Sequence, residues 1–253
     1  MPSNKLRNII LLFFLCSGTQ LFGDIPVTFK LGVGGDGRPT EEWLAAIRER
    51  VNSSRYERLK HTPGKVGPVQ EQWFKKIQSV AKDWIQHSHQ INSVFSGVRP
   101  PEKLTLLFGN QGGDDGFTFG LDTICLDLAA WEHSYGSPGL DAVDRIKRIL
   151  SHEYAHLLTK VYSVAVSFPK TSALFRAIYE MYYEGIGHYY SLSDKWVSAD
   201  GVLTPFADAR LKELQPKLLS RLKAIASDSG NNEESLRAGL SSGRFEEKWG
   251  ALP

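Results

Sequence analysis

One stretch, residues 148–158, restricts the fold of this chain more than any other, because it places His-Glu-x-x-His within an apolar helical pattern. Residues four apart lie on one face of a helix, so His152 and His156 are expected to point the same way. Two imidazoles on one face can bind Zn²⁺, and Glu153 then lies beside them as a base toward water. The motif therefore predicts metal-assisted hydrolysis.

The helix that contains this motif is predicted over residues 141–161. Apolar residues recur there at helical spacing, and Asp141 follows Ser-Pro-Gly-Leu, where an N-cap residue is expected. Because the chemistry needs the motif inside a helix, this context supports the metal hypothesis. The alternative interpretation is two ordinary histidines on a partly buried helix.

A catalytic zinc site usually has three protein ligands and a water. The extended motif that ends in Gly-x-x-His is absent, so the third ligand must come from elsewhere. The next helical pattern, residues 172–192, carries Glu180, Glu184 and His188 at intervals of four, on one face. All three remain candidates. Gly185 and Gly187, which closely follow Glu184, are poor helix formers and would let another backbone approach closely.

With its His-Glu-x-x-His motif and a downstream Glu-Gly pair, the sequence resembles the gluzincin metallopeptidases, the group that contains thermolysin and the zinc aminopeptidases. The matching segments span about residues 104–192 and resemble a set of predicted bacterial zinc proteases: LTLLFGNQGG, TICLDL, ILSHEYAHLL and YYEGIGHYY. The interval before the Glu-Gly pair is longer than in thermolysin-like enzymes, and a loop at 163–171 would absorb it. The resemblance implies that a strand near 118–128 lines the cleft and pairs with an extended peptide.

The resemblance also implies roles for single residues. It implies His152, His156 and Glu184 as zinc ligands and Glu153 as the general base. His188 stands four positions after Glu184, where relatives often carry an Asp that orients a ligand histidine. Its imidazole could donate to a carboxylate, protonate a leaving group, or simply be exposed. We therefore include His188 with Glu153 as a candidate catalytic residue.

The expected fold is α+β and zincin-like, with a small mixed sheet, an edge strand beside the motif helix, and mostly helical flanks. We expect a single domain over residues 24–253, with a helical C-terminal part from about 200 to 253. Strands are predicted from apolar or alternating runs, and helices from apolar spacing of three and four. The predicted strands are 25–30, 104–108 and the second half of 117–128. A first helix is predicted with Thr40 as its cap, and the other predicted helices are 69–95, 141–161, 172–192, 206–226 with a break near Pro216, and 233–240.

Residues 1–23 are predicted to form a secretory signal peptide. Two basic residues precede the apolar run 9–16, which is too short for a bilayer, where about 20 residues are needed. Cleavage is expected after Gly23, with Gly18 as the alternative. Cys16 does not follow a small residue, so a lipoprotein is the less favoured reading. The protein is thus expected to be secreted or periplasmic, without a stable membrane anchor.

Charge and cysteine content narrow the possible partners. The chain has 30 Lys and Arg against 28 Asp and Glu, and the predicted signal peptide contains two of the basic residues and no acidic one. The remainder is formally neutral, which does not favour nucleic acid, so we expect a peptide or protein substrate. Only one cysteine, Cys125, follows the signal peptide, so we expect a buried thiol and no intrachain disulfide. The oligomeric state stays open.

Together these features favour a zinc-dependent metallopeptidase with Zn²⁺ as its cofactor. The alternatives are a zinc-binding scaffold that does not cleave its partner, and a zinc hydrolase acting on non-peptide amides or esters. Glu153 argues mildly against the scaffold, because a structural site needs no base. A hydrolase also needs a donor to the oxyanion. The candidate donors are Tyr182, Tyr183, Tyr189, Tyr190, His188 and Arg210.

Overall fold

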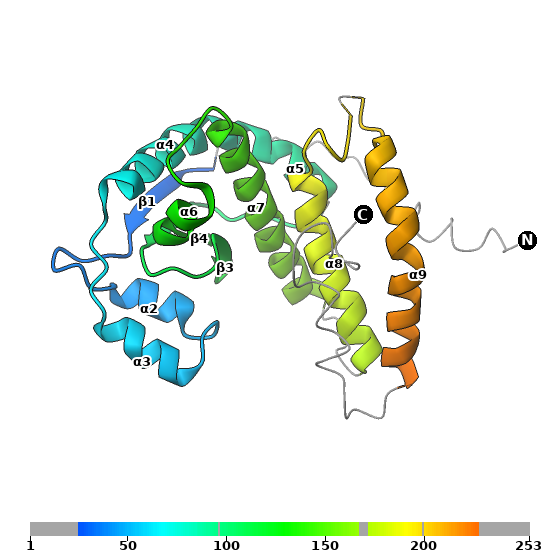
Figure 1. The fold of residues 1–253 in the computed structure, drawn as a ribbon, viewed down its shortest axis with the longest axis horizontal. Coiled ribbons are helices and arrows are strands. Elements are labelled where there is room, and N and C mark those ends of the chain that lie inside the picture. The colour runs from blue at the N-terminus through cyan, green and yellow to red at the C-terminus, as the bar shows by residue number, and fades with distance from the viewer. Residues whose placement is uncertain (1–24, 96, 167–171, 199, 228–253) are drawn as a thin grey trace, which may run out of the picture.

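The computed structural model describes residues 25–95, 97–166, 172–198 and 200–227 (Figure 1). Within these ranges, helices cover both faces of a four-stranded sheet. The elements in chain order are β1 (Val27–Leu31), α2 (Glu41–Ile47), α3 (Ser53–His61), α4 (Pro68–Trp84), the 3₁₀ turn η2 (Ile85–His87), α5 (Ser88–Val94), β2 (Leu104–Gly109), β3 (Gly116–Phe119), β4 (Thr123–Asp127), α6 (Leu128–Tyr135), α7 (Ala142–Val166), α8 (Ala173–Ser191) and α9 (Pro205–Ser227).

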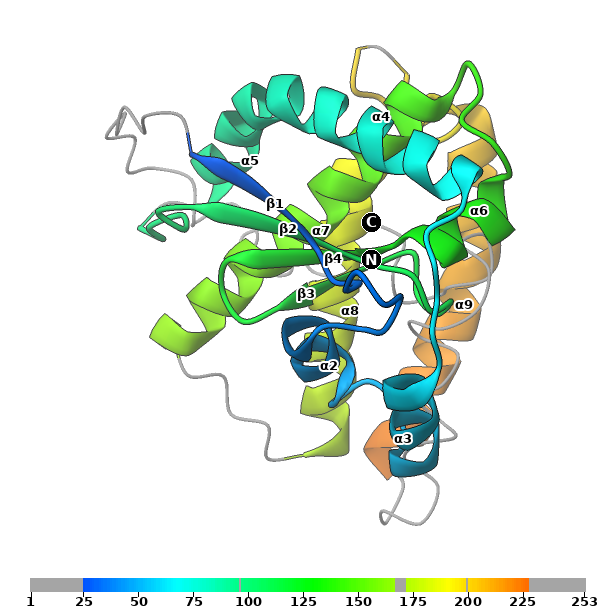
Figure 2. The ribbon, with the colours of Figure 1, turned by 90° about the vertical axis from the view of Figure 1, so that its left-hand side faces the viewer.

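The sheet is mixed, with strand order β1-β2-β4-β3. Strands β1, β2 and β4 are parallel, and β3 pairs antiparallel with β4 and forms one edge. Helix α4 lies over one face and α2 over the other (Figure 2). Alternate side chains of β4 therefore enter different clusters: Ile124 and Leu126 join the main core, whereas Cys125 packs with Trp43 of α2. The two predicted faces of this strand are confirmed, and both are buried.

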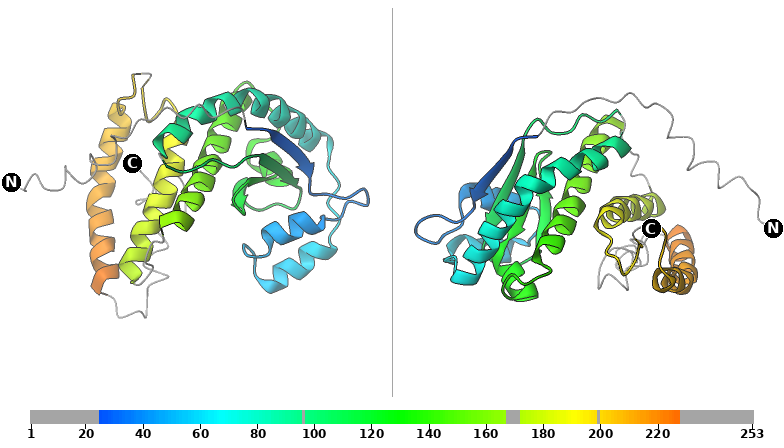
Figure 3. Two further views of the ribbon diagram at one scale, coloured as in Figure 1. Left: turned by 180° about the vertical axis from the view of Figure 1, so that it is seen from behind. Right: turned by 90° about the horizontal axis from the view of Figure 1, so that it is seen from above.

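Helix α7 lies between the sheet and α8, and α9 packs on the far side of α8 (Figure 3). Aromatic packing and hydrogen bonds hold the side of α7 that faces the core. The Tyr154 hydroxyl donates to Asn92 Oδ1 at 2.7 Å, and the Trp84 indole donates to Ser151 Oγ at 2.9 Å. The Trp84 and Tyr154 rings meet edge to face with centroids 5.6 Å apart. These contacts hold the rotation of α7, and thus the direction of its other face.

Several sequence predictions are confirmed. Thr40 caps α2 by accepting from the backbone N–H of Trp43, and Ser172 caps α8 by accepting from that of Phe175. The expected combination of helices with a small mixed sheet is correct, and the edge strand β3 packs beside the motif helix α7.

Three local predictions are wrong. Residues 69–95 divide into α4, η2 and α5, because the Ser88 hydroxyl donates to the Ile85 carbonyl at 2.6 Å and competes with the helical hydrogen bonds. The strand near 118–128 is a β3–β4 hairpin, in which Gly120 adopts a positive φ of 61°. Helix α9 continues through Pro216, since one missing backbone hydrogen bond does not end it.

Other predictions fall outside the described residues: the signal peptide over 1–23, the helix over 233–240 and the C-terminal end. Among the helices that are described, none combines the length and apolar composition needed to cross a membrane. Secretion and the single-domain organisation therefore stay predictions.

Candidate metal centre

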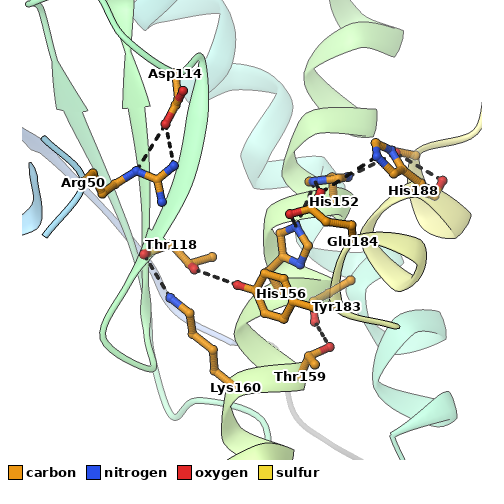
Figure 4. Close-up of polar contacts among 12 residues, drawn as sticks. Arg50, Asp114, Thr118, His152, His156, Thr159, Lys160, Tyr183, Glu184 and His188 are labelled. Carbon is orange, nitrogen blue, oxygen red and sulfur yellow. Dashed lines mark hydrogen bonds and ion pairs between the residues drawn. The ribbon is translucent and has the colours of Figure 1, made fainter. Parts of the chain in front are cut away.

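Three side chains converge between α7 and α8 (Figure 4). His152 and His156 project from successive turns of α7, and Glu184 faces them from α8. The Nε2 atoms of the two histidines are 2.9 Å apart. The Glu184 carboxylate oxygens lie 4.0 Å from His152 Nε2 and 3.9 Å from His156 Nε2. One donor atom of each residue thus falls within 4.8 Å of the other two.

This donor set fits Zn²⁺. Two imidazoles and one carboxylate form a known ligand combination for catalytic zinc, and ligands at about 2.0–2.1 Å in tetrahedral geometry stand about 3.3 Å apart. The observed separations bracket that value. Among the described residues, this is the one group of three or more His, Cys, Asp or Glu side chains arranged to hold a metal ion. Of the three candidates for the third ligand, Glu184 belongs to it, whereas Glu180 and His188 do not.

Gly187 allows the histidines to lie against α8. A Cβ atom at this position would stand 2.8 Å from Nδ1 of His152 and 2.9 Å from Cε1 of His156, closer than real contacts permit. At Gly185 a Cβ would meet nothing within 4 Å. The predicted approach of another backbone is therefore wrong: at Gly187 the close neighbours are imidazole rings, and at Gly185 there is no close neighbour.

Glu153 of α7 is buried, and its side chain lies against the start of the edge strand β3. A Cβ at Gly116 would lie 3.1 Å from Glu153 Oε1, so glycine in the strand leaves room for the carboxyl group. Burial, reinforced by the negative charges of Asp115 and Glu184, raises the pKa of Glu153 to about 8. A bound divalent cation would oppose this shift. The cation would thus favour the ionised form of Glu153, which a general base needs.

His188 is buried, which excludes the exposed role for this residue. Its Nε2 lies 3.9 Å from Glu184 Oε2, and its ring centroid is 4.9 Å from that of His152. The Ser191 hydroxyl lies 3.4 Å from His152 Nδ1 and donates to the His188 carbonyl at 3.2 Å. His188 thus lies beside Glu184 and His152, and Ser191 lies beside His152. Both can fix the orientation of these proposed ligands.

The cluster lines a cavity of about 800 Å³. Two of the candidate oxyanion donors, Tyr183 and His188, line it as well. The Tyr183 ring stacks on His156 with centroids 4.0 Å apart, and its hydroxyl lies 3.4 Å from Thr118 Oγ1 on β3. Burial raises the pKa of Tyr183, so its hydroxyl keeps the proton that a donor needs. The other candidates are not part of the lining: Tyr182, Tyr189, Tyr190 and Arg210.

Sequence reasoning missed the cationic side chains of this cavity. They are Arg50, Arg145, Arg148, Lys160 and Lys195. Three of them lie on α7 at helical distances from the motif histidines, so the spacing contained a signal for these three. The other two come from segments distant in sequence, and no pattern near the motif indicates them.

Comparison of the chain with models of protein families, with curated proteins and with solved structures finds no match in any of the three. The interpretation of the site therefore depends on its geometry and on the His-Glu-x-x-His motif.

Proposed function

We propose that this protein is a zinc-dependent metallopeptidase with a zincin-like fold, in which His152, His156 and Glu184 hold the metal and Glu153 is the general base. The observation that carries the proposal is the convergence of two histidines and a carboxylate beside a buried carboxyl group, in the wall of a cavity. Structural zinc sites usually have four protein ligands, whereas three leave a position for water or substrate.

The residues of the chain divide the work of hydrolysis. When bound, the metal ion supplies a Lewis acid for the scissile carbonyl and for water. Glu153 accepts the proton of the attacking water and passes it to the leaving amine. His188, which packs beside Glu184, keeps that carboxylate oriented. The Tyr183 hydroxyl, protonated and in the cavity wall, is the better placed oxyanion donor among the tyrosines.

The edge strand β3 supports a peptide as the substrate. Asp127 N donates to Asp115 O at 3.4 Å, so alternate residues of β3 turn their backbone groups toward β4, and Gly116 and Thr118 turn theirs outward. The outward Thr118 carbonyl accepts from Lys160 Nζ at 3.1 Å. An extended peptide can add to this edge beside Glu153. Small amides or esters would make no use of it.

Metal content tests the ligand assignment. Protein that starts at Asp24 is expected to contain about one zinc per chain, and Glu184→Ala should contain much less. Glu180→Ala, one turn away on the same helix, is the matched control and should keep its zinc. Equal zinc in Glu184→Ala and the wild type would move the third ligand elsewhere. Absence of zinc from reconstituted wild type would refute the proposal.

Activity separates the enzyme from its alternatives. Wild type should hydrolyse casein or an unstructured peptide, while Glu153→Gln should keep its zinc and lose that activity. A wild type that binds zinc and peptide without cleavage would be a scaffold. Cleavage of esters or small amides, but of no peptide, would support the non-peptide hydrolase.

We also propose that the protein acts outside the cytoplasm, as a secreted or periplasmic enzyme. The basis is the basic residues and apolar run that precede Gly23. N-terminal sequencing of protein recovered from the medium or periplasm of an expressing bacterium is expected to begin at Asp24. An intact N-terminus on cytoplasmic protein would contradict this.

A further inference from the structure

Two cations flank the proposed metal ligands along α7. Arg148 lies four residues before His152 and Lys160 four residues after His156, and both line the cavity. Four residues span about 6 Å of helix axis. An extended peptide advances about 6.6 Å in two residues, and residues two apart face the same way. For an extended peptide that runs along α7 with its scissile bond at the proposed metal ligands, groups about two residues from that bond come close to one cation or the other.

Arg148 has hydrogen-bonding capacity to spare. Its Nε pairs with Asp144 Oδ2 at 2.9 Å, and Asp144 is exposed and lies outside the cavity lining. The two Nη groups make no hydrogen bond to any residue in the described part of the chain. A guanidinium binds a carboxylate through two parallel N–H groups. Arg148 can thus receive a carboxylate in the cavity without breaking its existing pair.

Lys160 stands at the outer edge of β3. Its ammonium donates one hydrogen bond, to the outward Thr118 carbonyl at 3.1 Å. An ammonium has three N–H donors, so two remain for a ligand that lies along the same edge. The position is next to the path of an added peptide strand.

The acidic groups of the cavity wall do not cancel these two cations. The lining contains five Arg and Lys side chains against four Asp and Glu. Asp114 pairs with Arg50, whereas Asp115 keeps its negative charge and accepts from the neutral Tyr135 hydroxyl. The remaining acids, Glu153 and Glu184, belong to the proposed catalytic group, where a bound zinc would add two positive charges. The wall therefore attracts negative charge on both sides of the reacting bond.

We propose that this site selects acidic peptides, in which a carboxylate about two residues from the scissile bond binds Arg148 or Lys160. The inference rests on the proposed function, because it names the substrate of the same site. An Asp or Glu side chain and a free C-terminus present the same two oxygens, so either can supply the carboxylate. The same wall disfavours basic peptides and a free amino terminus near the reacting bond.

Three fluorescence-quenched peptides of equal length and blocked N-terminus test the preference. The first, neutral peptide carries Gln around the scissile bond and an amidated C-terminus. The second carries Glu at the same positions and an amidated C-terminus. The third carries Gln at these positions and ends in a free carboxylate two residues after the bond. The second and third separate a side chain from the C-terminus as the source. We expect kcat/KM for at least one of them to exceed that of the neutral peptide about tenfold, mainly through KM.

Three variants identify the residues responsible. Arg148→Gln or Lys160→Gln should reduce the ratio of acidic to neutral cleavage several-fold. Lys147→Gln removes a cation of the same helix that does not line the cavity and should leave the ratio unchanged. Fluorescence anisotropy of labelled peptides on Glu153→Gln protein gives Kd without turnover, and the acidic peptide should bind about tenfold more tightly.

The outcomes separate the two proposals. Equal kcat/KM and equal Kd for acidic and neutral peptides would overturn the acidic preference and leave the metallopeptidase intact. A preference that survives in both glutamine variants would overturn the roles of Arg148 and Lys160. If no peptide is cleaved, the proposed function is refuted, and the anisotropy measurement still decides whether the cavity selects carboxylates.

Discussion

The two faces of α7 belong to one helix and differ in almost every respect. The face toward the core carries Leu150, Tyr154 and Leu158, which are at most 1% exposed. The face toward the cavity carries His152 and His156 among charged neighbours. Apolar burial stabilises the fold, whereas grouped titratable side chains with restricted access to water cost free energy unless they bind something. The contacts of the core face therefore set where the cavity face points.

The largest expected effect on stability is at the core face. Tyr154→Ala removes a fully buried ring that packs on Trp84 and donates to Asn92, and should lower the free energy of unfolding by about 3–5 kcal/mol. Tyr154→Phe keeps the ring, loses one hydrogen bond, and should cost only about 1 kcal/mol. Urea denaturation measures both. A loss below 1 kcal/mol for Tyr154→Ala would show that the core face does not anchor α7.

At the cavity face the same kind of change should affect chemistry and spare the fold. Glu153→Gln keeps the shape of the side chain and removes its basicity, so peptide hydrolysis should fall about 10²–10⁴-fold. The free energy of unfolding should not decrease, because the raised pKa means that burial of this carboxyl group costs free energy near neutral pH, and an amide carries no such cost. Activity assays and urea denaturation on one preparation test both halves. If Glu153→Gln destabilised the fold as much as Tyr154→Ala, the cavity face would contribute to stability as the core face does.

The two glycines of α8 provide a matched pair for the contact with α7. Gly187→Ala places a Cβ at 2.8 Å from the His152 ring and should weaken zinc binding about 10–100-fold. Gly185→Ala meets nothing within 4 Å and should stabilise the helix by about 0.5–1 kcal/mol without changing zinc affinity. Titration against a competing chelator gives the affinities. Equal affinities for the two variants would mean that the rings can move aside at little cost.

Local signals made part of this fold predictable from sequence. The N-cap residues Thr40 and Ser172 act within three positions, so their helices could be located. Helix α6 was not predicted: its N-cap also acts within three positions, but that residue makes distant contacts as well and stands within an apolar run. Its N-cap Asp127 accepts from Ala130 nearby and also from the backbone of the loop at Gln111 and Gly112. In the sequence alone, the apolar residues around Asp127 continue the preceding strand.

The same limit applies to the site. The motif fixes His152 and His156 through a spacing of four, but Glu180, Glu184 and His188 share one helix face and the spacing cannot rank them. The contact of α8 with α7 selects among them, and it depends on how closely the helices pack. The cations on α7 were detectable in principle, since they follow the period of the histidines; recognising them requires knowing that this face borders a cavity.

The smallest expected effect on stability is that of replacing Arg148. Its pair with Asp144 is partly exposed and spans one helical turn, so Arg148→Gln and Asp144→Asn should each change the free energy of unfolding by at most about 0.5 kcal/mol. The two variants should change the preference for acidic over neutral peptides in opposite directions. Arg148→Gln removes the cation and should weaken the preference for acidic peptides, whereas Asp144→Asn removes a competing carboxylate and should strengthen it. Equal weakening by both variants would mean that the ion pair, rather than the free guanidinium, shapes the cavity.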